Sequence, residues 1–246
     1  MNKVFAAGVA LATGGLLVGG YVYASMWSTS QIFGKTLVAG PDTDSARHTV
    51  ALTYDDGPST RNTSPLLDLL AEFDVRATFF MIGEHVRKHT ELARRVVAAG
   101  HVIGNHTSMH PNLARKTPQR VRQELTTCQK TIEDLLGVSP VLFRPPYGAR
   151  RPDVLRTARS FGLTPVLWNA AAQDWLDIGA DAMQNNVDKA LARNRNAGSA
   201  TNVLLHDGSQ LDGPEPISRE CTITVTRTLL RRGAYRFTTP LEWLPA

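Results

Sequence analysis

The chain has 246 residues, of which 42% are hydrophobic and 20% are charged. This balance excludes a disordered or collagen-like chain, and the length predicts one domain or two at most. Two cysteines, Cys128 and Cys221, exclude a disulfide scaffold and a four-cysteine zinc site. The net charge of +5 suits anionic partners such as cell-wall polymers, phospholipid or nucleic acid, but it suits a solvated basic face equally well.

Residues 1–24 read as an export signal. After Lys3 no charge occurs until Lys35, and the apolar stretch that begins at Val4 is long for a cleaved signal and about long enough to span a bilayer. A cleavable signal peptide, with a weak site at 22–24, and a retained membrane anchor both stay open. In either case the rest of the chain is expected to be exported. Residues 25–47 are rich in Ser, Thr, Gly and Asp and read as a linker.

From residue 48 onward, apolar strands and amphipathic helices alternate. We predict strands at 48–54, 76–82, 101–105, 141–144, 164–169, 202–206 and 235–238. Helices are predicted at 66–73, 84–99, 118–136, 152–161, 181–193 and 217–232. This alternation favours one α/β domain over 48–246, with about seven strands in a mainly parallel sheet, either a barrel or an open doubly wound sheet. In both folds the loops after the strands carry the chemistry.

Acids and imidazoles follow two of these strands. Asp55 and Asp56 end the first strand, and neighbours in an extended chain point in opposite directions, so the two acids can have different tasks. His106 and His110 follow the third strand at a separation of one helical turn and can converge on one ion. A second pair with this spacing, His85 and His89, lies beside Arg87 and Lys88 in a predicted helix, and we interpret it as surface.

Three later strand ends add further polar groups. After the fourth strand, RPPYG (144–148) holds two prolines that stiffen the backbone, so the N–H of Tyr147 could be held toward an oxyanion. Asp174 and Trp175 follow the fifth strand. His206 ends the sixth and is a candidate general acid or base. Five strand ends that deliver acids, imidazoles and an arginine to one face indicate a catalytic site.

These residues together resemble the polysaccharide deacetylase family, also called the NodB-homology or carbohydrate esterase 4 family. The resemblance covers about 48–240 and rests on five motifs in the family's order, namely TYDDGP (53–58), HTSMH (106–110), RPPYG (144–148), DW (174–175) and LLH (204–206). It implies a distorted (β/α) barrel. One position departs from the family pattern, since Ala171 stands where an acid is common.

The resemblance also implies a role for each motif residue. Asp56, His106 and His110 would bind one divalent metal ion, most often zinc or cobalt. Asp55 would be the general base and His206 the general acid. Their partners would be Arg144, which keeps Asp55 ionised, Asp174, which tunes His206, Tyr147, whose backbone N–H faces the oxyanion, and Trp175 and Leu204, which wall the acetyl pocket.

The expected function is metal-dependent removal of N-acetyl groups from N-acetylglucosamine residues of a polysaccharide, such as peptidoglycan, chitin oligomers or poly-N-acetylglucosamine. The alternatives are a deacylase of another small acylated amine or ester, and a non-catalytic glycan-binding relative. The expected partners are an N-acetylated glycan polymer and, if the first segment is uncleaved, a membrane. We expect no nucleic acid and no obligate protein partner. The expected location is periplasmic, cell-surface or secreted. Cys128 and Cys221 are interpreted as small core residues.

Overall fold

The computed structural model describes residues 19–44, 46–210 and 218–245, and its strands form one sheet with parallel pairings. The strands are β1 (His48–Asp55), β2 (Thr78–Met81), β3 (Val102–Asn105), β4 (Leu142–Phe143), β5 (Thr164–Pro165), β6 (Ala170–Ala171), β7 (Thr201–His206) and β8 (Tyr235–Thr238). Their order is β5-β4-β3-β2-β1-β7-β6, and β8 pairs with the first half of β1. The central strand β1 is therefore fixed in register by three neighbours.

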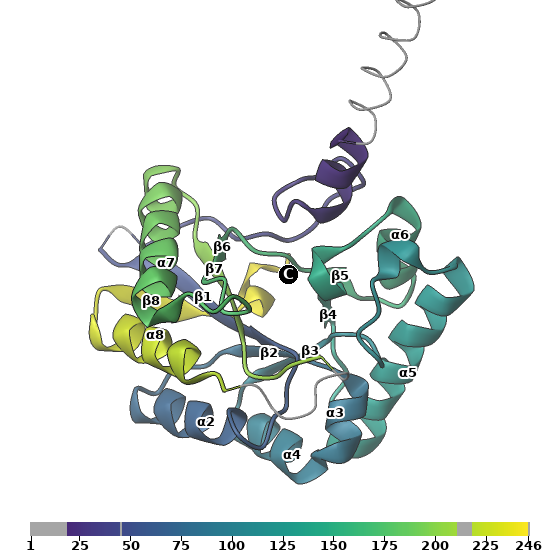
Figure 1. Cartoon of the computed structure of the whole chain (residues 1–246), viewed down its shortest axis with the longest axis horizontal. Helices are drawn as coiled ribbons and strands as arrows, with labels where there is room; N and C mark the ends of the chain where they lie inside the picture. Colours follow the sequence, from purple (N-terminus) through teal and green to yellow (C-terminus); the bar gives the residue numbers. More distant parts are fainter. Residues whose placement is uncertain (1–18, 45, 211–217, 246) are drawn as a thin grey trace, which may run out of the picture.

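The sheet curls because of its connection between β5 and β6. These strands lie at opposite ends of the strand order, yet only residues 166–169 separate them. A chain of this length spans roughly 18 Å at most, so the two edges of the sheet must approach each other. Leu37 lies at the gap, where its N–H donates to Pro165 O and its carbonyl accepts from Leu167 N–H, each at 2.8 Å. The result is the predicted distorted barrel (Figure 1), and the single strand predicted over 164–169 is wrong.

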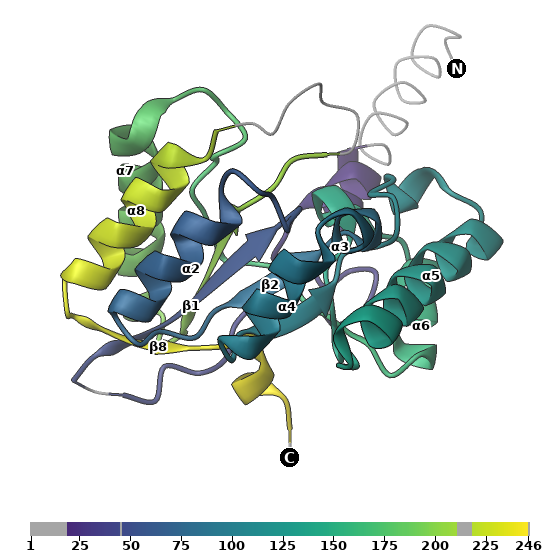
Figure 2. The same ribbon diagram turned by 90° about the horizontal axis from the view of Figure 1, so that it is seen from below.

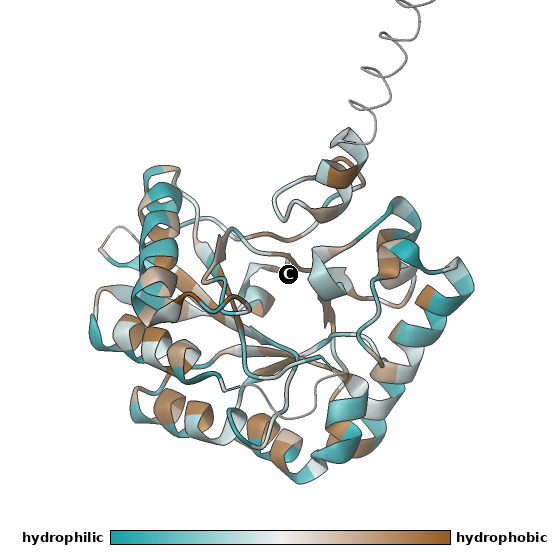
Figure 3. Ribbon diagram, in the orientation of Figure 1, coloured by the Kyte–Doolittle hydropathy of each residue, from teal (hydrophilic) through white to brown (hydrophobic). Residues whose placement is uncertain are grey.

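Helices cover the outside of the sheet (Figures 1 and 2). They are α2 (Thr63–Glu72), α3 (Gly83–Lys88), α4 (Thr90–Ala98), α5 (Pro118–Leu136), α6 (Pro152–Ser160), α7 (Gly179–Asn196) and α8 (Glu220–Arg231), with short 3-10 turns η1 (Leu113–Arg115), η2 (Pro146–Gly148) and η3 (Pro240–Trp243). Their outward faces are largely hydrophilic and their inward faces hydrophobic (Figure 3). The main core joins these faces to strand residues such as Leu52, Phe79 and Leu205.

Two helix predictions had different outcomes. Helix α5 has the predicted ends, since the hydroxyl of Thr117 accepts from Arg120 N–H and Gly137 closes the helix with φ of 69°. The single helix predicted over 84–99 is wrong, because the chain leaves helical geometry at His89 (φ −128°, ψ 45°) and divides into α3 and α4. The first N–H groups of α3 donate to the carbonyls of Thr107 and Ser108, so this short helix begins against residues 106–110, which we call the histidine loop.

The described part of the predicted linker is bonded to the barrel. Asp42 accepts from Thr49 N–H at 3.0 Å and lies 2.5 Å from Nδ1 of His48. Further toward the N-terminus, the carbonyls of Ser25, Trp27 and Ser30 accept from Arg150. The division of the chain at 47 thus stays a prediction. Most of the predicted signal or anchor, residues 1–18, lies outside the described residues. Among the described helices, none is long and apolar enough to cross a membrane.

Candidate active site

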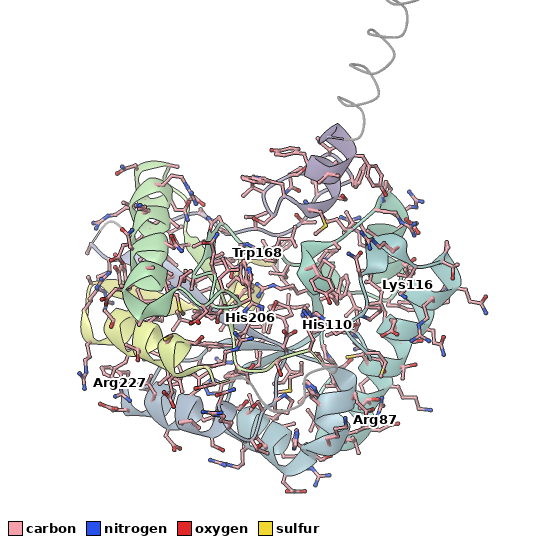
Figure 4. All side chains as sticks on the ribbon, viewed as in Figure 1. Arg87, His110, Lys116, Trp168, His206 and Arg227 are labelled. Atoms are coloured by element: carbon pink, nitrogen blue, oxygen red, sulfur yellow. The ribbon has the colours of Figure 1, made fainter. Side chains whose placement is uncertain are left out.

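The carboxyl ends of β1, β3, β4 and β7 open into a pocket of about 880 Å³. Figure 4 labels His110 and His206 near the centre of the barrel, whereas Arg87, Lys116 and Arg227 lie toward its outside. Of the site residues predicted from the sequence, the pocket lining includes Asp55, Asp56, His106, His110, Tyr147, Asp174, Trp175, Leu204 and His206. Arg144 lies behind the wall and is fully buried.

The turn after β1 separates the two adjacent acids. Asp55 still pairs with Phe80 and His206 across the sheet, whereas Asp56 has a φ of 72° and leaves the strand. Close backbone crossing makes this turn possible. A Cβ on Gly57 would lie 2.2 Å from the carboxyl of Asp207, and a Cβ on Gly208 would lie 1.9 Å from the carbonyl of Asp56, so neither position has room for a side chain.

Asp56, His106 and His110 form a cluster of buried side chains. The Nε2 atoms of His106 and His110 lie 3.3 and 3.1 Å from Oδ1 of Asp56, and the three ligand atoms are within 4.8 Å of one another. The pKa of the Asp56 carboxyl is held well below its usual value, because contacts with the two imidazoles outweigh the opposing effect of burial. The sequence prediction that these three residues converge agrees with this geometry.

The donor set of this cluster fits a divalent cation. His106 Nδ1 lies 2.7 Å from the carbonyl of Arg144, and because a carbonyl only accepts, Nδ1 carries the proton. In the neutral ring, Nε2 then carries the lone pair that a cation held between the ring and Asp56 would accept. Oδ1 of Asp56 and Nδ1 of His110 are buried without a hydrogen-bond partner in the described part of the chain. Two imidazole nitrogens and one carboxylate oxygen are ligands that suit zinc and similar ions.

The histidine loop is shaped by its own polar groups. The spacing of His106 and His110 suggested one helical turn, but Thr107 and His110 have φ of 68° and 54°, so this loop is not helical. The side chain of Asn105 accepts from Thr107 N–H, and buried Glu124 on α5 accepts from Met109 N–H at 2.8 Å. These bonds bring the two rings together by a route that the spacing alone did not reveal.

Arg144 and Asp55 form a buried ion pair. Nη1 of Arg144 donates to Oδ1 of Asp55 at 2.7 Å and to the hydroxyl of Thr53 at 2.9 Å. Burial lowers the pKa of Arg144, and the charge of Asp55 opposes this change. Ala171, at the position where the family often has an acid, lies in β6, and among the described residues Asp55 is the carboxylate that pairs with Arg144.

His206 and Asp174 form the second ion pair. Nδ1 of His206 donates to Oδ1 of Asp174 at 2.7 Å, while Oδ2 accepts from His206 N–H and from the hydroxyl of Thr222. Burial alone would lower the pKa of His206, but Asp174 and the charges of Asp56 and Asp55 raise it to about 9. The imidazole of His206 is thus held in its charged form at neutral pH.

Apolar and aromatic side chains wall the pocket. Tyr147, with φ of 60°, lies edge-on to His110 at 4.8 Å, and Trp175 lies edge-on to His206 at 5.6 Å. Leu204 is buried in the wall. Several other residues line the pocket but lie outside the five motifs, so sequence reasoning had no basis on which to select them. They are Trp168, Met183, Gln210, Arg219 and Thr222.

Three residues differ from their sequence interpretation. His85 is half-buried rather than on the surface, and its Nδ1 bonds to the carbonyl of Asp56 at 2.7 Å, because α3 lies against the turn after β1. His89, at the end of α3, is also half-buried. Cys221 is exposed at the pocket rather than in the core, because the buried face of α8 runs through Thr222 and Val225. Cys128 is buried as expected, and the two cysteines are unpaired.

Comparisons with known proteins show the family to which the chain belongs. The family model described as polysaccharide deacetylase matches residues 42–166. The chain is 34% identical over 200 residues to a peptidoglycan-N-acetylglucosamine deacetylase of Bacillus cereus, a match that covers 79% of this chain and 87% of that protein. It is 38% identical over 184 residues to a chitooligosaccharide deacetylase of Bradyrhizobium, with 74% and 80% covered. The chain belongs to the polysaccharide deacetylase family.

Solved structures support the same assignment. A peptidoglycan N-acetylglucosamine deacetylase in complex with 4-naphthalen-1-yl-N-oxidanyl-benzamide aligns with a TM-score of 0.70 at 30% identity, over 85% of this chain and 92% of that chain. A mutant of a carbohydrate esterase 4 pseudoenzyme with restored enzymatic activity aligns with a TM-score of 0.72 at 25% identity, over 86% and 71%. The resemblance, the fold and the hydrolase class inferred from the sequence are confirmed.

Proposed function

We propose that this protein hydrolyses the acetamido groups of N-acetylglucosamine residues in a glycan polymer outside the cytoplasm. The observation that carries the proposal is the separation of two adjacent acids, since Asp55 is paired with Arg144 while Asp56 faces two imidazoles. Metal-assisted amide hydrolysis can use one carboxylate to accept a proton and another to hold the cation, and this turn offers two carboxylates in different surroundings. Relatives named as peptidoglycan and chitooligosaccharide deacetylases favour a polymer or oligomer substrate.

Asp56, His106 and His110 would hold the cation, for which zinc or cobalt is expected. Bound there, it would polarise the acetyl carbonyl and acidify the attacking water. Asp55 then accepts the proton of the water. Arg144 fixes the Asp55 carboxylate through Oδ1, which leaves Oδ2 on the side of His106, at 3.7 Å from Nε2.

His206 would complete the reaction as the general acid. Its imidazole is charged at neutral pH because Asp174 stabilises that form, so it can give a proton to the leaving amine. The backbone N–H of Tyr147 would stabilise the oxyanion that forms during attack. Trp175 and Leu204 would contact the acetyl methyl group. Tyr147 and Trp175 are both about half-exposed at the mouth, where successive sugar rings could pass.

The location would follow from the substrate. Relatives that are named as peptidoglycan deacetylases favour a cell-wall or extracellular substrate, and the uncharged segment that starts at Val4 is typical of an exported chain. An N-acetylated glycan is accordingly the partner that we propose.

Release of acetate from chitooligomers and from purified peptidoglycan tests the proposal. We expect release from at least one of them, and its loss on treatment with a chelator should be reversed by zinc or cobalt. The matched variant His106→Asn should lose bound metal, measured by atomic spectroscopy, together with at least about 99% of the rate. Chelator-insensitive release, or full activity of the His106→Asn variant, would contradict the proposed role of the cluster.

A further inference from the structure

The proposed chemistry leaves one large apolar surface unused. Six large hydrophobic side chains are exposed between residues 21 and 32, including Trp27 at 60% and Ile32 at 67%. We call this surface the apolar foot, and it consists of Tyr21, Val22, Tyr23, Met26, Trp27 and Ile32. Elsewhere, three of the other exposed large hydrophobic side chains, Tyr147, Trp175 and Leu176, line the catalytic pocket. The apolar foot therefore needs a partner of its own.

Arg150 fixes the apolar foot to the barrel. Its backbone N–H donates to Ser25 O at 3.0 Å, and its guanidinium donates to the carbonyls of Ser25, Trp27, Ser30 and Gly148 at 2.7–3.3 Å. Ala24 and Ser25 are buried between foot and barrel. Because one side chain binds three carbonyls of this short segment, the backbone that carries the exposed side chains is held against the barrel.

The composition of the apolar foot matches the interfacial layer of a bilayer. Tyr23 and Trp27 stack at 5.8 Å beside aliphatic Val22, Met26 and Ile32, and none of the six carries a charge. Tyr and Trp are enriched where hydrocarbon meets water, while aliphatic side chains enter the acyl region. A sugar platform would combine aromatic faces with many hydrogen-bonding side chains. Here the hydrogen-bonding groups are two Tyr hydroxyls and the indole N–H of Trp27, and half of the surface is Val22, Met26 and Ile32.

Positive charge adjoins the apolar foot. The exposed Lys35 follows it in sequence, and the side chain of Arg159 bonds to the carbonyl of Lys35. Basic groups beside an apolar surface attract the anionic lipids of a membrane. Residues 4–18, which precede the apolar foot in the sequence, contain no charged residue. The apolar foot therefore follows a stretch whose composition suits lipid, and no charged residue separates the two.

We propose that the apolar foot rests in the interfacial layer of an anionic phospholipid bilayer. Gly148, in the pocket wall, shares Arg150 with Ser25, so the mouth of the pocket is held beside that bilayer. Figure 2 shows this N-terminal segment on one side of the barrel and the C-terminus on the other. A second consequence rests on the proposed function: the glycan attacked would be the one that lies at the membrane surface.

Fluorescence of Trp27 tests the contact without using activity. The full chain is reconstituted in vesicles of phosphatidylcholine and phosphatidylglycerol whose acyl chains are brominated, and the difference between wild type and Trp27→Phe reports Trp27. We expect brominated lipid to quench most of this emission. The matched control is the emission of Trp243, near the C-terminus, obtained as the difference between wild type and Trp243→Phe. Brominated lipid should leave this emission unchanged. Met26→Ser combined with Ile32→Ser should weaken the quenching of Trp27 by about half or more.

Three results would overturn the proposal. Trp27 could be quenched by aqueous acrylamide and not by brominated lipid. A chitooligomer, or a second copy of the chain in detergent, could shield Trp27 where lipid does not. Finally, the mature protein could be found to begin at Ser25, in which case it lacks Tyr21, Val22 and Tyr23. Since none of these measurements uses acetate release, their failure is distinct from a failure of the proposed deacetylation.

Discussion

Arg144 and Arg150 are both fully buried and lie in one loop region, yet their surroundings differ. Arg144 meets a carboxylate, Asp55, at 2.7 Å, and its guanidinium carbon lies 4.1 Å from the ring centre of Phe80. Among the described residues, the guanidinium of Arg150 donates to backbone carbonyls, those of Ser25, Gly148, Trp27 and Ser30. Burial lowers the pKa of Arg150 to about 10, so it is still charged at neutral pH.

The two arginines show two uses of a buried cation, one paired with a carboxylate and one with backbone carbonyls. Arg144 binds Oδ1 of Asp55, so this pair orients the carboxylate that we propose as the general base. Carbonyl dipoles do not titrate, so Arg150 orders the backbone and alters no charge in the pocket. We therefore expect changes around Arg144 to affect the reaction most, and changes around Arg150 to affect stability most.

The largest effect is expected for Asp55→Asn, which removes the carboxylate partner of Arg144. The rate of acetate release should fall by about 10²–10⁴-fold, because an amide cannot accept the proton of water. Metal content should be unchanged, since Asp55 is not among the three clustered ligands. Steady-state rates and atomic spectroscopy check this. A variant with the wild-type rate would show that Arg144 pairs with a carboxylate for stability alone.

Arg150→Met tests the other half of the comparison. The carbonyls of Ser25, Trp27, Ser30 and Gly148 lose their donor, so the free energy of unfolding should fall by about 3 kcal/mol. Urea denaturation measures the loss, and the rate per folded molecule should change by about twofold or less. Arg156→Met, at an exposed position of the same region, is the control and should change stability by about 0.5 kcal/mol or less. Lost activity at unchanged stability would reverse the assignment.

Asp174→Asn removes a carboxylate partner of His206. The pKa of His206 is raised to about 9, above its ordinary 6.5, so the charged ring stabilises the fold fully below about pH 6.5. This contribution is lost as the pH rises through 9, and the rate should fall in the same range. In the variant the alkaline limb of the pH–rate profile should move down by about one to two pH units. An unmoved limb would assign the general acid to another group.

Asp207→Asn is expected to have the smallest effect and extends the comparison to a buried acid. Burial raises the pKa of Asp207 to about 7, assisted by the charges of Asp56 and Asp55 and opposed by a hydrogen bond from Thr63. Its neutral form stabilises the fold fully below pH 3.8, and this stability is lost as the pH rises through 7. The free energy of unfolding of the variant should therefore be about 1 kcal/mol higher than that of the wild type at pH 8, and nearly the same as the wild type at pH 4. A loss of stability at both pH values would contradict this.

The strand ends could be predicted because their residue types are unusual there. Paired acids after an apolar strand, and imidazoles after two others, are expensive to bury unless they share a task. The parallel topology then brings them to one edge of the sheet. Their convergence on one pocket therefore follows from periodicity and from a few polar side chains.

Other features left no trace in the sequence. The acceptors of Arg150 are backbone carbonyls more than a hundred residues away, and backbone groups are the same in every sequence. The segment 164–169 reads as one strand because its apolar residues fit a sheet, but closure of the barrel draws residues 166–169 across the gap. Thr222 supports Asp174 from α8, and an isolated threonine gives no signal of such a contact.

The bridge formed by Leu37 has a practical consequence for protein production. A shortened version begun at His48, where the first regular strand starts, would lose Leu37 and its hydrogen bonds to Pro165 and Leu167 at the end of β5. It would also remove the carbonyls of Ser25, Trp27 and Ser30, which accept from the guanidinium of Arg150. A version begun at Ala24 keeps both features, and it is the sensible starting point for crystallisation.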